Sequence, residues 1–393
     1  MLAALLRAAA FLIGALAVTV LVHGYLYRRL IRDTDLAPAW RDRARFATLG
    51  AAALLPAGMA GLLLMRQAPR AVAAPLMWCA FSWVGLLVLL LPFMFAGEAV
   101  RAWARLREGR DPPDPERRRA LARLIGMASG GATLGLGGVS AFVAQEPPRV
   151  RRLRVPLPGL GAAMSGYKLV QISDVHVSAT IGRGLVEALV ADVNALEPDL
   201  VAITGDLVDG SVAELGPLLA PLARLRARDG VYFITGNHEY LSGAEEWLAH
   251  VTSTLGFRVL RNERVAIGQA GGFDLIGVDD PSGSSWLAGH GTDLPAALRG
   301  RDPSRASVLL AHRPDDVLEA ARHGIGLQLS GHTHGGQITP IGWALERLRQ
   351  PYVFGLYEVG KTTLYVTSGA GYWGPPMRLA TRSEIVLFEL AGA

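Results

Sequence analysis

Five short clusters of aspartate, asparagine and histidine follow apolar segments in the C-terminal part of this 393-residue chain. They read DVH (174–176), GDLVD (205–209), GNHE (236–239), HRP (312–314) and GHTH (331–334). Carboxylate, amide and imidazole groups without a thiolate suit divalent metals such as Mn, Fe or Zn. The candidate ligands are Asp174, His176, Asp206, Asn237, His312, His332 and His334. Seven ligands are too many for one ion but suit two ions that share a carboxylate, an arrangement used for phosphoryl transfer.

The segments ahead of these clusters predict an α/β domain over residues 150–393. Seven short runs rich in β-forming residues are typical of strands: 168–173, 199–204, 231–235, 273–278, 306–311, 363–368 and 384–390. Apolar residues at helical spacing predict helices over 182–196, 212–227 and 314–323. Because ligands of α/β proteins gather at the carboxyl ends of strands, we expect the five clusters to converge at one sheet edge. The preceding stretch, QEPPRVRR (145–152), reads as a linker into this domain.

The closely spaced pair His332 and His334 has two interpretations when taken alone. A glycine-rich turn could carry two solvated histidines, and a metal site could use both as ligands. The four other clusters favour the metal site. Gly335 and Gly336 then allow positive φ angles and close backbone approach, so that the two imidazoles can turn toward different ions.

The ordered set D-x-H, G-D-x-x-D, G-N-H-E, a single H and G-H-x-H resembles the calcineurin-like metallophosphoesterase superfamily. GHTHGGQ, together with apolar segments ahead of the domain, is most similar to its YkuE/YaeI-type membrane-associated bacterial branch. The motifs cover residues 174–334, and the resemblance extends over most of 150–390. It implies a four-layer α/β/β/α sandwich, in which the later strands form a second sheet.

The resemblance also implies a role for each candidate residue. One metal would be held by Asp174, His176, Asp206 and His334, and the other by Asp206, Asn237, His312 and His332, with Asp206 bridging. A metal-bridging hydroxide would attack phosphorus in line. His238 matches the family's non-ligand histidine, which contacts the phosphate and protonates the leaving oxygen, while Asp209 would orient it.

Several polar residues could have a structural role instead of a role in the site. Asp209 could instead cap the helix predicted from 212, and Glu239 could simply begin a helix. Asp279 and Asp280 could form a turn or line the site, and Trp373 and Arg378 could contact substrate. Four histidines without a motif read as structural or surface residues: His23, His250, His290 and His323.

The N-terminal region, residues 1–145, predicts a membrane domain. Half of the whole chain is hydrophobic and its mean hydropathy is positive, at +0.29. Four runs without a charged residue predict spans at about 8–27, 46–65, 71–97 and 124–145, each long enough to cross a bilayer as a helix. The fourth is rich in Gly, Ala and Ser, so it could be a span packed through small residues or an export signal-like segment.

Arginines gather in the loops between these spans. Residues 1–150 hold 18 arginines and 9 acidic residues, whereas the rest of the chain is slightly acidic. The high isoelectric point is therefore no evidence for nucleic-acid binding, and we expect no nucleic-acid partner. Because positive loops stay in the cytoplasm, we expect a multi-pass membrane protein with the loops 28–45 and 98–123 inside. The resemblance to the YkuE/YaeI-type branch implies that this membrane is the bacterial inner membrane. The C-terminal domain would then face the exterior or periplasm if the fourth segment crosses.

These observations predict a membrane-anchored phosphoesterase with two divalent metal ions that acts on a phosphodiester or a phospholipid-type ester. Proximity to a membrane favours a lipid-linked substrate. Gly210 stands where the protein Ser/Thr phosphatases of the superfamily carry arginine, which argues against that branch. A pyrophosphatase of lipid-linked nucleotides is an alternative, although those enzymes have arginine in the place of His238. A non-catalytic scaffold or sensor is another. The metal identity and the oligomeric state stay open.

Overall fold

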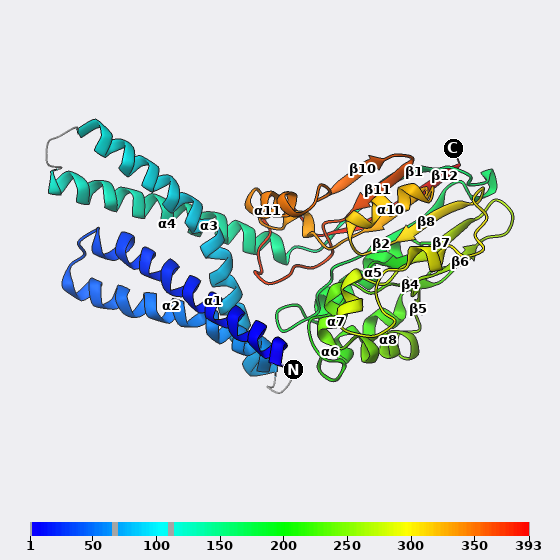
Figure 1. Cartoon of the computed structure of the whole chain (residues 1–393), viewed down its shortest axis with the longest axis horizontal. Coiled ribbons are helices and arrows are strands. Elements are labelled where there is room, and N and C mark those ends of the chain that lie inside the picture. The colour runs from blue at the N-terminus through cyan, green and yellow to red at the C-terminus, as the bar shows by residue number, and fades with distance from the viewer. Residues whose placement is uncertain (1, 65–69, 109–113, 393) are drawn as a thin grey trace. The chain divides into compact units, whose positions relative to one another are not determined.

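The computed structural model describes residues 2–64, 70–108 and 114–392. The chain divides after Ser140 into two compact units. The first unit is helical, and the second contains both β-sheets (Figure 1). The long helix α4 continues across the boundary into the second unit.

Four long helices build the first unit. They are α1 (Leu2–Tyr27), α2 (Pro38–Leu64), α3 (Arg70–Glu108) and α4 (Pro115–Gln145). Among the described residues, two helices are long and apolar enough to cross a membrane, at Ala71–Arg107 and Pro115–Gln145. The predicted spans 8–27 and 46–65 include residues outside those whose side chains the structure describes. Of the four predicted spans, the described residues therefore support two, the third and the fourth.

Small residues bring these helices close together. A Cβ atom at Gly137 of α4 would lie 2.7 Å from the Leu86 side chain of α3, and one at Gly58 of α2 would lie 2.6 Å from the Ala80 Cβ of α3. Only glycine allows such close backbone approach. The Gly-rich fourth segment thus approaches α3 closely at Gly137, whereas a Cβ atom at Gly130, Gly131, Gly135 or Gly138 would meet nothing within 4 Å.

Two six-stranded sheets form the core of the second unit. In spatial order, the first comprises β1 (Arg149–Leu157), β12 (Glu384–Gly392), β2 (Tyr167–Ile172), β3 (Leu200–Ile203), β4 (Val231–Phe233) and β5 (Arg258–Val259). The second comprises β10 (Gly355–Val359), β11 (Thr362–Val366), β9 (Leu327–Ser330), β8 (Ala306–Leu310), β7 (Phe273–Gly277) and β6 (Glu263–Ile267). Strands β2 to β5 run parallel, as do β7, β8, β9 and β11. Both sheets are therefore mixed. The first has one antiparallel pair, β12 with β2, and the second has an antiparallel pair at each edge, β10 with β11 and β6 with β7.

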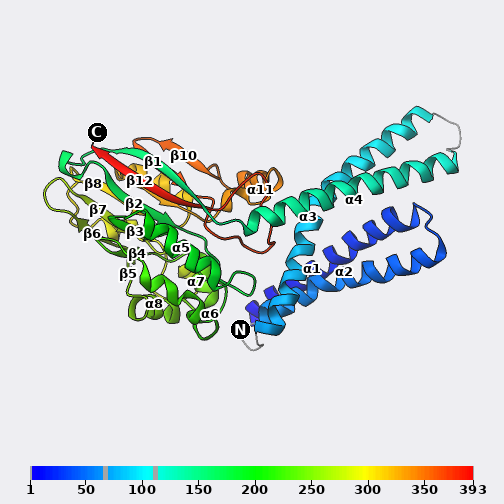
Figure 2. The same cartoon turned by 180° about the vertical axis from the view of Figure 1, so that it is seen from behind.

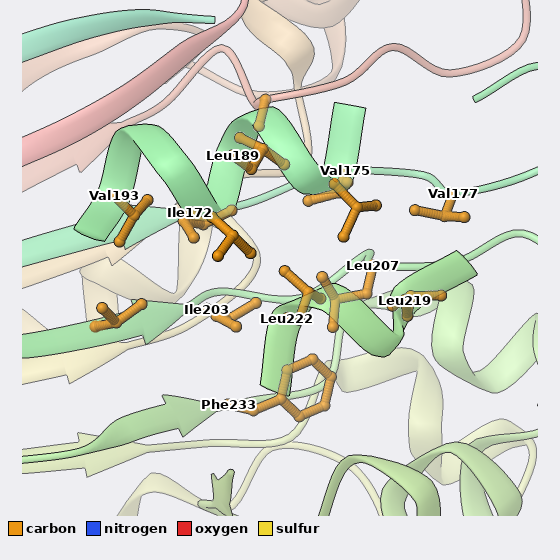
Figure 3. Packing of buried hydrophobic residues seen from close by; sticks show 14 of the residues in the cluster. Ile172, Val175, Val177, Leu189, Val193, Ile203, Leu207, Leu219, Leu222 and Phe233 are labelled. Atoms are coloured by element: carbon orange, nitrogen blue, oxygen red, sulfur yellow. The ribbon is translucent and has the colours of Figure 1, made fainter. Parts of the chain in front are cut away.

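Alternation along the strands separates two apolar layers. On β2, Leu169 belongs to a cluster that also contains Leu329 of the second sheet, whereas Ile172 points into a cluster with helices on the outer face. Figure 3 shows the outer cluster, where Ile172, Ile203 and Phe233 meet Leu189 and neighbouring side chains. The inner cluster is the contact between the two sheets.

Helices cover the outer faces of both sheets (Figure 2). The first sheet is covered by α5 (Arg183–Ala195), α6 (Val212–Leu219) and α8 (Ala244–Ser253). The second is covered by α9 (Leu294–Ala297) and α10 (Val317–Arg322). Two further helices, α7 (Asn237–Ser242) and α11 (Ile341–Arg349), lie in the connections. The fold is thus α/β with two packed sheets.

Three sequence expectations need correction. Residues 149–152, read as part of a linker, begin β1, which pairs in parallel with β12. The helix predicted over 212–227 ends at Leu219 and continues as a 3-10 turn through Arg224, because Pro221 cannot supply an α-helical backbone donor. The five clusters follow strands of both sheets, rather than one sheet edge.

Candidate metal centre

Strand ends from both sheets bring the five clusters together. Strands β2, β3 and β4 of the first sheet lead into the clusters at 174, 206 and 237, and β8 and β9 of the second lead into those at 312 and 332. Gln171 of β2 joins the sheets just before the site, since its Nε2 donates to the Thr204 hydroxyl at 2.9 Å and to the Ser330 carbonyl at 3.1 Å. This buried amide holds the two sheet edges in register.

One group of possible ligands contains Asp174, His176 and His334. The Nε2 atoms of His176 and His334 lie 3.0 Å apart, and Nε2 of His334 lies 3.6 Å from Oδ1 of Asp174. All three residues are buried. Two imidazole nitrogens facing each other beside a carboxylate are suited to surround one cation.

A second group contains Asp206, His312 and His332. Nε2 of His312 lies 3.1 Å from Oδ2 of Asp206, and the rings of His312 and His332 are 5.1 Å apart. The same Oδ2 lies 3.7 Å from Nε2 of His176 in the first group. Asp206 therefore stands between the groups, and His332 and His334 face different ones.

Buried polar atoms without a partner test whether these residues fit metal ions. Among the described residues, such atoms include Oδ2 of Asp174, Oδ1 of Asn237 and Nδ1 of His334. Leaving a buried polar atom unpaired costs about 1–3 kcal/mol, and the two unpaired oxygens offer lone pairs that a cation would satisfy. The residues fit a cationic group.

Electrostatics favour the ligand forms of some candidates and oppose those of others: burial raises the pKa of Asp174, and although burial would lower the pKa of His312, Asp206 and nearby carboxylates raise it to about 10. Burial lowers the pKa of His332 to about 3 and holds the pKa of His334 well below its usual value. Burial would raise the pKa of Asp206, but the charges of His312, His238 and His176 together outweigh burial and lower that pKa. Neutral imidazoles and an ionised carboxylate are the forms that bind metals.

Asp209 holds two histidines of the site. Its Oδ1 lies 2.6 Å from Nδ1 of His238 and 3.1 Å from Nδ1 of His176. Burial would lower the pKa of His238, but Asp206 and Asp209 raise it to about 9. The ring of His238 also meets that of Trp373 edge-on at 5.5 Å. His238 lies close enough to His176 and Asp206 to form a third possible group.

The sequence suggests that Glu239 simply begins a helix, but in the structure its carboxylate also connects two loops. Its buried carboxylate accepts hydrogen bonds from three backbone N–H groups, those of Gly236 at 2.7 Å, Asp206 at 3.0 Å and Leu207 at 2.8 Å. Burial raises its pKa to about 7. Glu239 thereby ties the loop after β3 to the loop after β4.

The loops that carry the candidate ligands adopt unusual backbone conformations. Five of the seven candidates have positive φ: Asp174, His176, Asp206, His332 and His334. Left-handed non-glycine residues cost of order 1–3 kcal/mol each and cluster at functional sites. Gly335 and Gly336 also have positive φ, at 60° and 74°, as expected. A Cβ atom at Gly331 would overlap the Asp174 carboxylate, so this glycine makes room for a candidate ligand.

Four residues left open by the sequence receive distinct positions. Arg378 is fully buried and donates to the carbonyls of Ser368 and His334, so it braces loops behind the site. Trp373 is 51% exposed, and its ring contacts that of His238, so it lies where the candidate site meets solvent. Asp279 and Asp280 are buried in ion pairs, with Arg261 at 2.8 Å and Arg313 at 2.9 Å.

The four histidines without a motif lie outside the described ligand groups. His23 accepts from the indole of Trp83 at 2.9 Å and contacts the Thr19 carbonyl. The other three have neighbours of their own: Trp247 for His250, Tyr240 for His290 and Glu319 for His323.

Comparison with known proteins agrees with this site. The model of the calcineurin-like phosphoesterase family matches residues 167–336. A bovine transmembrane protein with a metallophosphoesterase domain is 39% identical over 329 residues, covering 80% of this chain and 73% of its own. This chain belongs to the calcineurin-like metallophosphoesterase family. The bovine alignment is longer than the second unit, so it includes part of the N-terminal region.

Bacterial relatives give the same assignment. An uncharacterized metallophosphoesterase of Helicobacter pylori is 36% identical, covering 70% of this chain and 73% of its own. The uncharacterized metallophosphoesterase YkuE of Bacillus subtilis is 30% identical, covering 70% of this chain and 97% of its own. The resemblance to YkuE seen in the motifs is confirmed. The chain is a metallophosphoesterase, a hydrolase of phosphoric esters.

Proposed function

We propose that this metallophosphoesterase uses a dinuclear centre in which Asp206 bridges two ions. One ion is held by Asp174, His176, Asp206 and His334, and the other by Asp206, Asn237, His312 and His332. The position of the Asp206 carboxylate carries the proposal, since its Oδ2 lies within 3.7 Å of a histidine from each group. The donor chemistry suits Mn, Fe or Zn.

The residues around the centre divide the catalytic work. When bound, the two ions supply Lewis-acid charge for the phosphoryl group and lower the pKa of water. His238 donates a proton to the leaving oxygen through Nε2, because its Nδ1 is occupied by Asp209 at 2.6 Å. Asp209 fixes this orientation and stabilises the protonated ring. His238 is thus assigned as an acid and not as a ligand.

The substrate proposed is a phosphodiester or a phospholipid-type ester. Gly210, in the place of an arginine, leaves the loop after Asp209 without the cation found in protein phosphatases of the superfamily. Trp373 presents an exposed apolar ring beside the acid His238, which favours a substrate with an organic group on the leaving side. Proximity to a membrane would supply lipid-linked esters.

Membrane anchoring rests on the helical unit. Two apolar helices and the similarity to a protein described as transmembrane support it. The two arginine-rich segments 28–45 and 98–123 are joined in space, because Arg123 donates to the Thr34 carbonyl at 2.9 Å. They would stay on the cytoplasmic side, with the catalytic unit exterior or periplasmic. A reporter fused to the C-terminus tests this, and a cytoplasmic signal would refute it.

The hydrolase proposal is tested with the full chain purified in detergent and loaded with Mn, Fe or Zn. A panel of phosphomonoesters and phosphodiesters, including a glycerophosphodiester, is assayed beside Asp206→Asn. Asp192→Asn, on the outer helix α5, is the matched control. We expect diester hydrolysis by wild type and control, and a loss of at least a hundredfold in Asp206→Asn. Hydrolysis of no ester would support the scaffold alternative and refute the proposal.

A further inference from the structure

A cavity of about 810 Å³ lies in the helical unit, at the end where α1 leads into α2 and α3 into α4. Eight of its fifteen lining residues are arginines, and two are aspartates. The lining comes from the end of α3, the start of α4 and the segment after α1. The cavity is therefore strongly positive, and no residue of the candidate metal centre takes part in it.

Specific contacts hold the arginine-rich segments around this cavity. Nη2 of Arg29 lies 2.6 Å from Oε2 of Glu98, which joins the end of α1 to α3. Nε of Arg123 donates to the carbonyl of Thr34 at 2.9 Å, which joins the first segment to α4. The fold thus brings together segments whose charges repel one another, instead of leaving them as separate exposed loops.

The carboxylates that the structure describes near the cavity do not neutralise it. Glu98 is shared by Arg29 and Arg101, with Nη1 of Arg101 at 2.7 Å from Oε1. Arg101 is only 7% exposed, and its Nη2 is buried without a hydrogen-bond partner. Five other arginines of the lining make no ion pair with any described residue: Arg32, Arg105, Arg107, Arg117 and Arg118. Uncompensated positive charge around a partly open cavity is suited to an anion.

The surroundings indicate which anion. Arg105 and Arg118 lie on the two helices of the described chain that are apolar enough to span a membrane. Trp103, also in the lining, is 57% exposed and carries Arg107 over its ring at 4.6 Å. Tryptophan is enriched at the level of lipid headgroups, and basic pockets between spanning helices bind anionic headgroups.

We propose that this cavity binds the phosphate of an anionic phospholipid headgroup. Guanidinium groups supply charged, bidentate donors for phosphate oxygens, and the exposed Trp103 places the site at headgroup level. A soluble phosphate would share the donor chemistry but not the need for a neighbouring apolar surface. The site shares no residue with the phosphoesterase centre, so this proposal can be tested independently of the proposed reaction.

The test measures binding to the full chain in neutral detergent by isothermal titration calorimetry. The probes are dioctanoyl phosphatidylglycerol, dioctanoyl phosphatidylcholine, glycerol phosphate and inorganic phosphate. We expect phosphatidylglycerol to bind at least tenfold more tightly than the other three. Equal binding of the two lipids would overturn the proposal. Glycerol phosphate or inorganic phosphate binding as tightly as phosphatidylglycerol would overturn it in favour of a soluble anion.

Variants locate the binding in the cavity. The triple variant Arg32→Gln, Arg105→Gln and Arg118→Gln removes three lining charges that make no described ion pair. The matched control is Arg28→Gln, Arg43→Gln and Arg45→Gln, which lowers the charge equally outside the lining. We expect at least a tenfold loss of phosphatidylglycerol affinity in the first and less than twofold in the second. Unchanged affinity in the first would refute the assignment. If the triple variant does not fold, Arg105→Gln alone is expected to lose several-fold in affinity, and its unchanged affinity would be equally decisive.

Discussion

Oδ1 of Asp209 lies 2.6 Å from Nδ1 of His238 and 3.1 Å from Nδ1 of His176. One carboxylate therefore orients both a candidate metal ligand and the proposed proton donor. A carboxylate behind an imidazole fixes its tautomer and strengthens the opposite nitrogen as a ligand or, in the protonated ring, as a donor. In the mechanism we propose, Asp209 would couple metal binding at His176 to proton transfer from His238.

Replacing His238 by alanine should reveal a leaving-group dependence. Proton donation contributes typically 10²–10⁴-fold in rate, and it matters most when the leaving oxygen is a poor leaving group. We expect kcat to fall by about that factor for an alkyl diester, with a much smaller fall for a nitrophenyl ester and unchanged metal content. His323→Ala, on the surface near Glu319, is the control. An equal fall for both esters would contradict the role of His238.

Glu239→Gln should weaken metal binding without changing any ligand. The carboxylate accepts from the backbone N–H groups of Gly236, Asp206 and Leu207, and an amide would present a donor to one of them. Loss of such supporting contacts typically costs 10–100-fold in metal affinity. Calorimetric titration of the metal-free full chain measures this. Glu187→Gln, an exposed carboxylate paired with Arg183, should keep wild-type affinity, and a wild-type result for Glu239→Gln would exclude the bracing role.

The sequence predicts where the candidate ligands meet because each follows an apolar strand within a short motif. Asp174 and His176, for example, come directly after the buried strand β2. The sequence does not predict that Glu239 connects the loops after β3 and β4. Its contact with Gly236 is local and resembles a helix start, whereas its partners Asp206 and Leu207 lie more than thirty residues away. Non-local hydrogen bonds leave no periodic trace in a sequence.

The edge strand β1 and the role of Arg378 are likewise not predictable from the sequence. Strand β1 carries arginines at 149, 151, 152 and 154, and much of it is exposed. Such a composition is typical of a linker, and only pairing with β12, more than two hundred residues later, makes it a strand. Arg378 was also unassignable from its surroundings in sequence, because its partners His334 and Ser368 lie in loops that meet only in the folded domain.

Asp316 should make stability depend on pH. Burial, with the charges of Asp315 and Asp280, raises its pKa to about 7, and its Oδ2 has no hydrogen-bond partner. A carboxyl whose folded pKa is raised binds its proton more tightly in the folded state, so stability is lost as pH rises from about 4 to 7. We expect Asp316→Asn to raise stability at pH 8 by on the order of 2 kcal/mol.

Thermal unfolding of the full chain at pH 5 and pH 8 measures this difference. The gain from Asp316→Asn should nearly vanish at pH 5, where the wild-type carboxyl is already protonated. Asp315→Asn, at an exposed neighbour, serves as the comparison and should give only the smaller effect of removing one nearby charge. A gain of the same size at both pH values would show that the ionisation of Asp316 is not the cause.

The number of metal ions per chain tests the dinuclear centre most directly. The measurement is elemental analysis of the full-length protein after metal loading and removal of free metal, for wild type, Asp206→Asn and the control Asp192→Asn. Because Asp206 lies between both groups of ligands, the structure predicts about two ions for wild type and the control. It predicts fewer than one ion for Asp206→Asn. Two ions retained by Asp206→Asn, or no ion bound by wild type, would contradict the bridged centre.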